Sequence, residues 1–330
     1  MIQAVILFIV GLILLIKGGD WFVDGATGIA ERFHLPEILI GATVVSIGTT
    51  LPEVMVSATS ALTGHGEIAY GNAIGSIICN AALIAAITIA VKPGPVDAGS
   101  LKLPMFFFFG AAVFYAGIAY ASGYFSRGIG IVLLSIFVVY IVLTVKQMKM
   151  APADKNGQTG DINETGSGEK GKESPLWKEL LLLVVGAALI AVGADLLVDN
   201  GTLIAQALGV PESVIALTFV ALGTSLPELV TAITSLAKGH GSLSLGNIIG
   251  ANLFNLVLVS GVSVTLSPFH IPQGSMLFGQ NASLVLDIPV MFGVMLLLAL
   301  PAFLKKKLYR VQGIALLAVY AAFCVIQFVM

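Results

Sequence analysis

The sequence has little charge and almost no cysteine. Only 10% of its 330 residues are charged, whereas 57% are hydrophobic. A soluble domain carries roughly 25% charged residues, so this composition excludes an ordinary soluble protein and indicates an integral membrane protein. Cys79 and Cys324 both lie in apolar stretches, and they provide neither a disulfide framework nor a metal-binding spacing. The net charge of -2 says little about partners, and we expect no nucleic acid among them.

The N-terminal stretch also lacks the basic lead and the clear cleavage site of a signal peptide, so we interpret it as a permanent span. Ten stretches are long and apolar enough to cross a bilayer as helices, whereas a β-barrel would need short alternating strands. The sequence therefore predicts an all-α integral membrane protein with ten transmembrane helices. The predicted spans run near Ile2–Gly18, Leu35–Leu62, Ile68–Val91, Leu103–Ser122, Gly128–Val145, Trp177–Leu197, Val214–Ala237, Leu243–Leu266, Leu284–Leu304 and Tyr309–Phe328.

One hydrophilic segment divides the chain. Ala151–Pro175 is rich in Gly, Asp, Glu, Lys, Asn and Thr, which predicts a flexible loop. We expect a first five-helix unit at 1–147, a loop at 148–176 and a second five-helix unit at 177–330. If the N-terminus lies outside, almost all Lys and Arg fall on inside loops and only Arg127 on an outside loop. The positive-inside rule then predicts a multi-pass cell-membrane protein with both termini outside and a cytoplasmic central loop.

The two halves repeat one another without a gap. Asp20–Asn80 aligns with Asp195–Asn255, 175 residues later, and the matches include Asp, Glu, Asn, His and Pro. Two motifs occur once in each half. The first motif reads GTTLPE in the first half and GTSLPE in the second, and the second motif reads GNAIGSIICN and GNIIGANLFN. Because five spans are an odd number, the second half enters the membrane from the opposite side. This pattern predicts an inverted-topology repeat, which suits alternating access, although channels can also contain repeats.

Each copy of the first motif places an acid in the middle of a span. A carboxylate there costs about 2.5–3.5 kcal/mol, and no other span has a basic residue near its centre to pair with Glu53 or Glu228. We therefore expect a bound cation or a proton as the countercharge. Pro52 and Pro227 lack an N–H, so we expect a helix break at each one, where the carbonyls of the preceding turn, around Ser46 and Ala221, can turn into a cavity.

Neutral oxygens surround each acid. The first motif supplies the hydroxyls of Thr49, Thr50, Thr224 and Ser225. The second places Asn72, Ser76 and Asn80 on one helix face, with Asn247, Ala251 and Asn255 as the matching stripe. Such stripes can also hold helices together, so we give only Asn80 and Asn255 to the ion site. The GxxxG glycines, Gly71 with Gly75 and Gly246 with Gly250, are expected to permit close helix packing. Oxygen ligands suit hard cations such as Ca²⁺ and Na⁺.

These motifs resemble the cation/calcium antiporter superfamily, in particular sodium/calcium exchangers of prokaryotic type. The resemblance implies that spans two, three, seven and eight form the ion-binding core, and that the first and sixth helices slide as a gate. It implies Ca²⁺ ligands at Glu53 and Glu228, with backbone oxygens at Thr49 and Thr224. It implies Na⁺ ligands at Thr50, Ser76, Ser225 and the two acids, with backbone oxygens at Ser46 and Ala221, while Asn80 and Asn255 line the central position.

Three positions depart from that family pattern. Ala251 stands where many relatives have Ser, Ile77 stands where Asn is common, and Asn255 stands where many have Asp. The last change resembles the potassium-independent branch. We expect a monomeric Na⁺/Ca²⁺ antiporter in the lipid bilayer, with transported ions and no cofactor. A Ca²⁺/H⁺ exchanger using the same two acids is the alternative, and a cation channel is the alternative of another class. An enzyme is not expected, because no Ser-His, Asp-Asp or His-metal constellation lies mid-membrane.

Overall fold

The computed structural model describes residues 2–150, 175–208, 223–274 and 276–329, and these are almost entirely helical. The first half contains α1 (Ile2–Arg32), α2 (Glu37–Ile40), η1 (Gly41–Val45), α3 (Ser46–Leu62), α4 (Gly66–Cys79), η2 (Asn80–Ile84), α5 (Ala85–Val91), α6 (Ala98–Ala121), β1 (Tyr124–Phe125) and α7 (Arg127–Met150). The second contains α8 (Leu176–Ala207), α11 (Leu226–Ala237), α12 (Gly241–Phe254), η4 (Asn255–Val259), α13 (Ser260–Leu266), β2 (Phe269–His270), β3 (Met276–Leu277), β4 (Gln280–Asn281), η5 (Ser283–Asp287), α14 (Ile288–Lys305) and α15 (Arg310–Val329).

The helices confirm the predicted membrane class. Among the described residues, nine continuous helical segments are long and apolar enough to cross a bilayer, and α11 is a shorter apolar helix. The predicted seventh span ends with α11, while its first part, 214–222, lies outside the described residues. The strands are two-residue pairings in loops, which leaves the all-α class intact.

Two pairs of loops lie together at helix ends. The loop after α5 meets the loop after α14, where Pro95 forms a bridge with Lys307. At another pair of loops, β1 lies antiparallel to β2, with Phe125 opposite Phe269. The side of the membrane on which each pair lies stays a prediction.

The first and sixth helices are longer than predicted. α1 continues to Arg32 instead of ending near Gly18, and α8 continues to Ala207 instead of ending near Leu197. Hydropathy follows contact with lipid, whereas a helix continues through polar residues as long as its backbone bonds and packing are kept. As a result, Asp20 and Asp24 lie on a helix and not in a loop.

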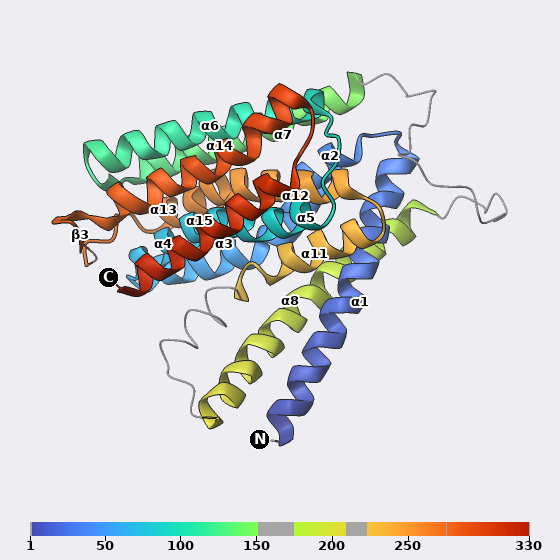
Figure 1. Ribbon diagram of the computed structural model, residues 1–330, viewed down its shortest axis with the longest axis horizontal. Coiled ribbons are helices and arrows are strands. Elements are labelled where there is room, and N and C mark those ends of the chain that lie inside the picture. The colour runs from blue at the N-terminus through green and yellow to red at the C-terminus, as the bar shows by residue number, and fades with distance from the viewer. Residues whose placement is uncertain (1, 151–174, 209–222, 275, 330) are drawn as a thin grey trace.

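Glycines bring α1 and α8 into close contact, and the two helices run side by side away from the main bundle (Figure 1). A Cβ added at Gly11 would lie 2.9 Å from the carbonyl oxygen of Gly193, and one added at Gly186 would lie 2.8 Å from that of Gly18. The two contacts are equivalent by the repeat, because Gly186 corresponds to Gly11 and Gly193 corresponds to Gly18, each 175 residues later. The contact between α1 and α8 therefore has the same internal symmetry as the two halves of the sequence.

The α12 glycines also have the packing role that was predicted for them. A Cβ at Gly250 would lie 2.7 Å from the Cα of Ala42, and one at Gly246 would collide with the backbone of Ile38. No described atom lies within 4 Å of a Cβ built at Gly71 or Gly75. Their symmetry-related partners would be residues 213 and 217, which are outside the described residues, so that half of the prediction stays a prediction.

Two matched asparagines begin π-helical turns. η2 starts at Asn80 and η4 starts at Asn255, the same position in each repeat. A π-helical turn widens the backbone ladder and is often found at functional sites. Both turns begin at the last residue of the second motif, in the middle of a span. They therefore mark the level of the membrane at which the candidate site is expected.

Candidate cation site

The two copies of the first motif fold differently. α3 is continuous from Ser46 to Leu62 and contains Pro52 within it. In the second copy, Gly223–Ser225 ends in a turn, and α11 begins at Leu226 with Pro227 in its first turn. We expected a helix break in each copy, and this is wrong for the first. A proline removes only one backbone bond, and packing on both sides of Pro52 keeps the helix running through it.

Glu53 and Glu228 are the chemical centre of the site. Both side chains are fully buried, and they lie beside one another. Glu228 also lies beside Thr49 and Thr50, yet none of the four carboxylate oxygens has a hydrogen-bond partner of good geometry in the described part of the chain. The described ion pairs involve other acids, and none reaches either glutamate. Two buried acids without protein donors or countercharges are therefore suited to a cation.

Neutral oxygens without partners accompany the acids. The hydroxyls of Thr50 and Ser225 and the amide oxygens of Asn80 and Asn255 are buried and accept or donate no bond within the described residues. The Asn255 amide nitrogen donates to the carbonyl oxygen of Ala251 at 3.1 Å, which leaves its oxygen free. An unsatisfied buried polar group costs about 1–3 kcal/mol. A hard cation coordinated by these oxygens would offset that cost.

The structure brings two acids together at this level. In the part of the chain that the structure describes, no group of three or more His, Cys, Asp or Glu side chains could hold a metal ion. A cation held by Glu53 and Glu228 would therefore need neutral oxygens to complete its shell.

For three of the other predicted ligands, Ser76, Ser46 and Ala221, the structure gives little or no geometry. Ser76 is buried on α4. The Ser46 hydroxyl donates to the Gly41 carbonyl at 2.7 Å, and the Ser46 carbonyl oxygen lies 3.5 Å from the Thr49 hydroxyl. Ala221 lies outside the described residues, so its assignment stays a prediction.

Two amides that we had left out of the site connect its halves. The Thr224 hydroxyl donates to Asn72 Oδ1, and the Thr49 hydroxyl donates to Asn247 Oδ1, each at 3.2 Å. Each threonine thus bonds to the other repeat. The matched asparagines in the second motif were a visible signal, but their sequence could not show that they bond across repeats.

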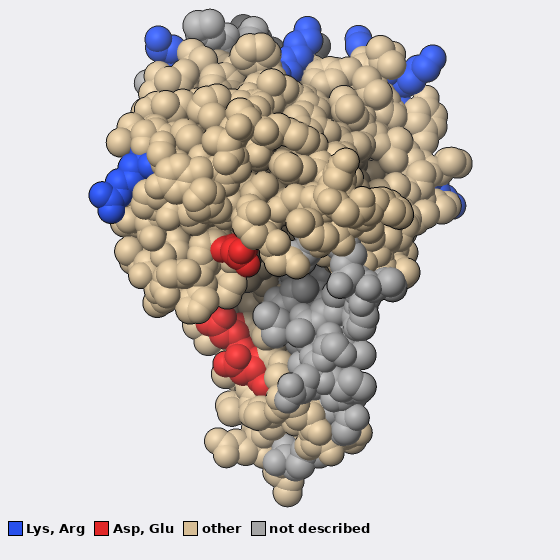
Figure 2. Space-filling model, turned by 90° about the vertical axis from the view of Figure 1, so that its left-hand side faces the viewer, with Lys and Arg blue, Asp and Glu red and all other residues tan. Residues whose placement is uncertain are grey.

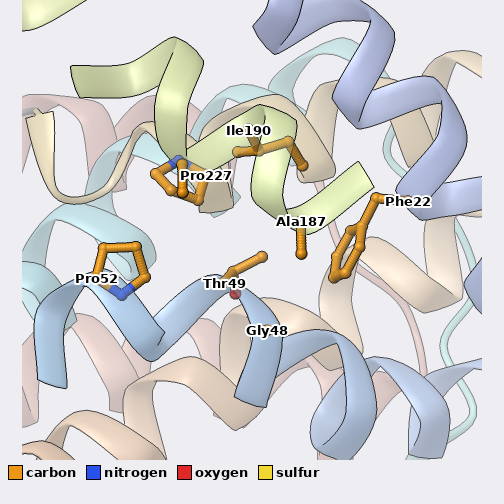
Figure 3. Close-up of a pocket in the computed structure, with 8 residues that line it drawn as sticks. Phe22, Gly48, Thr49, Pro52, Ala187, Ile190 and Pro227 are labelled. Atoms are coloured by element: carbon orange, nitrogen blue, oxygen red, sulfur yellow. The ribbon is translucent and has the colours of Figure 1, made fainter. Parts of the chain in front are cut away.

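A cavity lies where the long helix pair meets the two proline turns. Figure 3 shows Phe22 of α1 and Ala187 and Ile190 of α8 on one side, with Pro52, Thr49 and Pro227 opposite them. Gly48 and Ala191 also line this cavity. Thr49 therefore connects a space beside α1 and α8 with the buried acids, because it also lies beside Glu228.

Together, the apolar helices, the paired repeats and the buried uncompensated acids define a membrane transporter for cations. The family described as "Sodium/calcium exchanger protein" matches residues 3–146 and again residues 178–329. The chain belongs to this family, and the two matches coincide with the two halves of the repeat.

Relatives match over nearly the full length. The putative antiporter CaxA of Alkalimonas amylolytica is 34% identical over 326 residues, which cover 98% of each protein. The sodium/calcium exchanger MaX1 of Methanosarcina acetivorans is 28% identical, again over 98% of each. A solved structure of the sodium-calcium exchanger NCX_Mj, soaked with Na⁺ and Sr²⁺, is similar with a TM-score of 0.79, 34% identity and 97% coverage of each chain.

Proposed function

We propose that this protein exchanges Na⁺ for Ca²⁺ across the cell membrane by alternating access, with both ions competing for one site built on Glu53 and Glu228. The observation that carries the proposal is the pair of fully buried acids with no hydrogen-bond donor and no cationic partner among the described residues. Family membership and the exchangers named among its relatives give the same function class.

The charge balance explains why exchange is coupled. Two carboxylates carry -2, which one Ca²⁺ neutralises, whereas Na⁺ ions use the acids together with the hydroxyls of Thr50, Ser76 and Ser225. The ions exclude each other because they need the same carboxylates. Moving the site through the low-dielectric zone without a bound ion would expose an uncompensated charge pair, so transit without cargo should be rare.

The access route follows from the cavity. We propose that α1 and α8 slide as one unit against the core, because Phe22, Ala187 and Ile190 line the cavity opposite Pro52 and Pro227. Residues 1–147 and 177–330 are then the two repeats and 148–176 the cytoplasmic loop, with both termini outside. In this orientation the face in Figure 2 is the outer one. Figure 2 shows Asp and Glu in a strip from the middle of this face onto its narrow lower part, and Lys and Arg at its upper and side edges, which favours the approach of cations along the strip.

The proposal is tested with purified protein in proteoliposomes loaded with Na⁺. Radioactive Ca²⁺ should accumulate when the outside medium lacks Na⁺, and accumulation should stop when Na⁺ is equal on both sides. Uptake driven by a pH gradient without Na⁺ would instead establish a Ca²⁺/H⁺ exchanger. A large Ca²⁺ current without any counter-ion would establish a channel and overturn the proposal.

A further inference from the structure

Asn72 joins three groups at the level of the site. Its Nδ2 donates to Ser57 Oγ at 2.8 Å and to the Glu53 carbonyl at 3.3 Å. Its Oδ1 accepts from the Thr224 hydroxyl at 3.2 Å. One amide on α4 therefore ties the turn that carries an ion-binding acid in the first repeat to the loop that precedes α11 in the second.

Asn247 makes the symmetry-related contact. Its Oδ1 accepts from the Thr49 hydroxyl at 3.2 Å. Thr49 and Asn247 are related to Thr224 and Asn72 by the same shift of 175 residues, with the repeats exchanged. Two segments of different backbone shape, a continuous helix and a helix start, thus preserve one threonine–asparagine bond across the interface.

The two amides differ in one partner. Ser57 corresponds to Ala232 in the second repeat, and Ala232 has no hydroxyl to accept a bond. The Nδ2 of Asn247 is accordingly buried without a partner in the described part of the chain. Leaving such a donor unpaired costs about 1–3 kcal/mol, so the second amide is held less firmly than the first.

We propose that Asn72 and Asn247 are positioning residues that hold Thr224 and Thr49 against the opposite repeat, and that the Ser57–Ala232 difference makes this hold unequal. The inference rests on the proposed function, in which these threonines contribute oxygens beside Glu228 and Glu53. Groups that orient metal ligands typically change metal affinity 10–100-fold when removed. Here the same contact also joins the two repeats, so it fixes the separation of the ligands that each repeat supplies.

The test measures Ca²⁺ binding by equilibrium dialysis and, separately, the KM and maximal rate of Na⁺-driven uptake. Asn72→Ala and Thr224→Val should each raise the Ca²⁺ Kd and KM about 10–100-fold, with the maximal rate largely kept. The double variant should be no worse than Asn72→Ala alone, because that change already removes the bond to Thr224. Asn200→Ala is the matched control, since that buried amide donates to Leu196 of its own helix and to no other described residue, and the Kd of this variant should not change.

The asymmetry has its own test. Ser57→Ala should raise the Ca²⁺ Kd, Ala232→Ser should lower it, and the combined swap should recover part of the Ser57→Ala loss. Additive effects of Asn72→Ala and Thr224→Val, or an unchanged Kd with a lowered melting temperature, would overturn the inference in favour of a structural role. Absence of Ca²⁺ binding by the unaltered protein would instead overturn the proposed function.

Discussion

Replacing Glu53 or Glu228 by glutamine removes one of the two charges on which the proposed exchange depends. The change keeps the shape of the side chain, and both carboxylates are fully buried without a hydrogen-bond partner among the described residues. Two unit charges 4 Å apart interact by about 4 kcal/mol at an effective dielectric constant of about 20, and a divalent ion doubles this. Glutamine is neutral and costs less to bury than a carboxylate, which offsets part of this lost attraction. Truncating one partner of a buried charge pair typically lowers the binding free energy by about 2–5 kcal/mol.

That free energy corresponds to a loss of Ca²⁺ affinity of roughly 30-fold to several thousand-fold. A monovalent ion loses half as much electrostatic energy, about 1–2.5 kcal/mol, which is roughly 5- to 60-fold per Na⁺. Each variant should therefore shift selectivity toward Na⁺ as well as weaken binding. The assay is competition of Na⁺ with radioactive Ca²⁺ in equilibrium dialysis, followed by Na⁺-driven uptake with the same preparations.

Glu67→Gln is the matched control, because it makes the same chemical change at an exposed carboxylate at the start of α4. It should leave both affinities unchanged. If Glu53→Gln and Glu228→Gln both retain exchange with the original KM, the site assignment is wrong. If Ca²⁺ and Na⁺ affinities fall by the same factor, the assignment can stand but the charge-based account of selectivity is refuted.

Three further changes probe the neighbouring elements. Ala251→Ser adds a neutral oxygen worth about 1 kcal/mol, so the Na⁺ concentration that half-displaces Ca²⁺ should fall roughly five-fold, and no change would exclude this position from the Na⁺ shell. Gly18→Ala places a Cβ within 3 Å of backbone atoms of α8, so the maximal transport rate should fall while the Ca²⁺ Kd is kept. Gly117→Ala, where no described atom lies within 4 Å, should be harmless. Lys238→Met removes the 2.7 Å ion pair that joins the end of α11 to Asp24 on α1. Because α1 is proposed to slide against the core, uptake should become faster, with under about 1 kcal/mol of stability lost. A rate that falls together with the melting temperature would contradict this.

The membrane class and the repeat could be predicted because they depend on local composition and on matches between distant residues. Apolar stretches show where lipid contact occurs, and a polar residue repeated in register is conspicuous among them. Glu53 and Glu228 were conspicuous for the same reason, since a buried carboxylate is costly wherever it occurs. Their lack of a basic partner could also be predicted, because no other span carries a basic residue near its centre.

Other features depend on packing that one sequence does not contain. The same hydropathy is compatible with a short or a long α1, and only its contact with α8 shows that the helix continues past Gly18. Likewise, Pro52 and Pro227 stand in equivalent motifs, yet one lies within a helix and the other near a helix start. The partners of Asn72 could not be predicted either, because Thr224 is distant in sequence and belongs to the other repeat.

The differences between the repeats have a common physical consequence. Two identical halves related by a twofold axis would hold a cation at the axis with the same ligands from each side. Among the hydroxyls proposed as Na⁺ ligands, Thr50 is matched by Ser225 but Ser76 is matched by Ala251, so the first repeat supplies two of the three. The charges remain equal, one acid per repeat. A divalent ion bound by the two acids can therefore stay central, whereas ions that depend on neutral oxygens are drawn toward the first repeat. If the proposed function holds, the equal acids suit Ca²⁺, and the unequal hydroxyls create unequal positions for Na⁺.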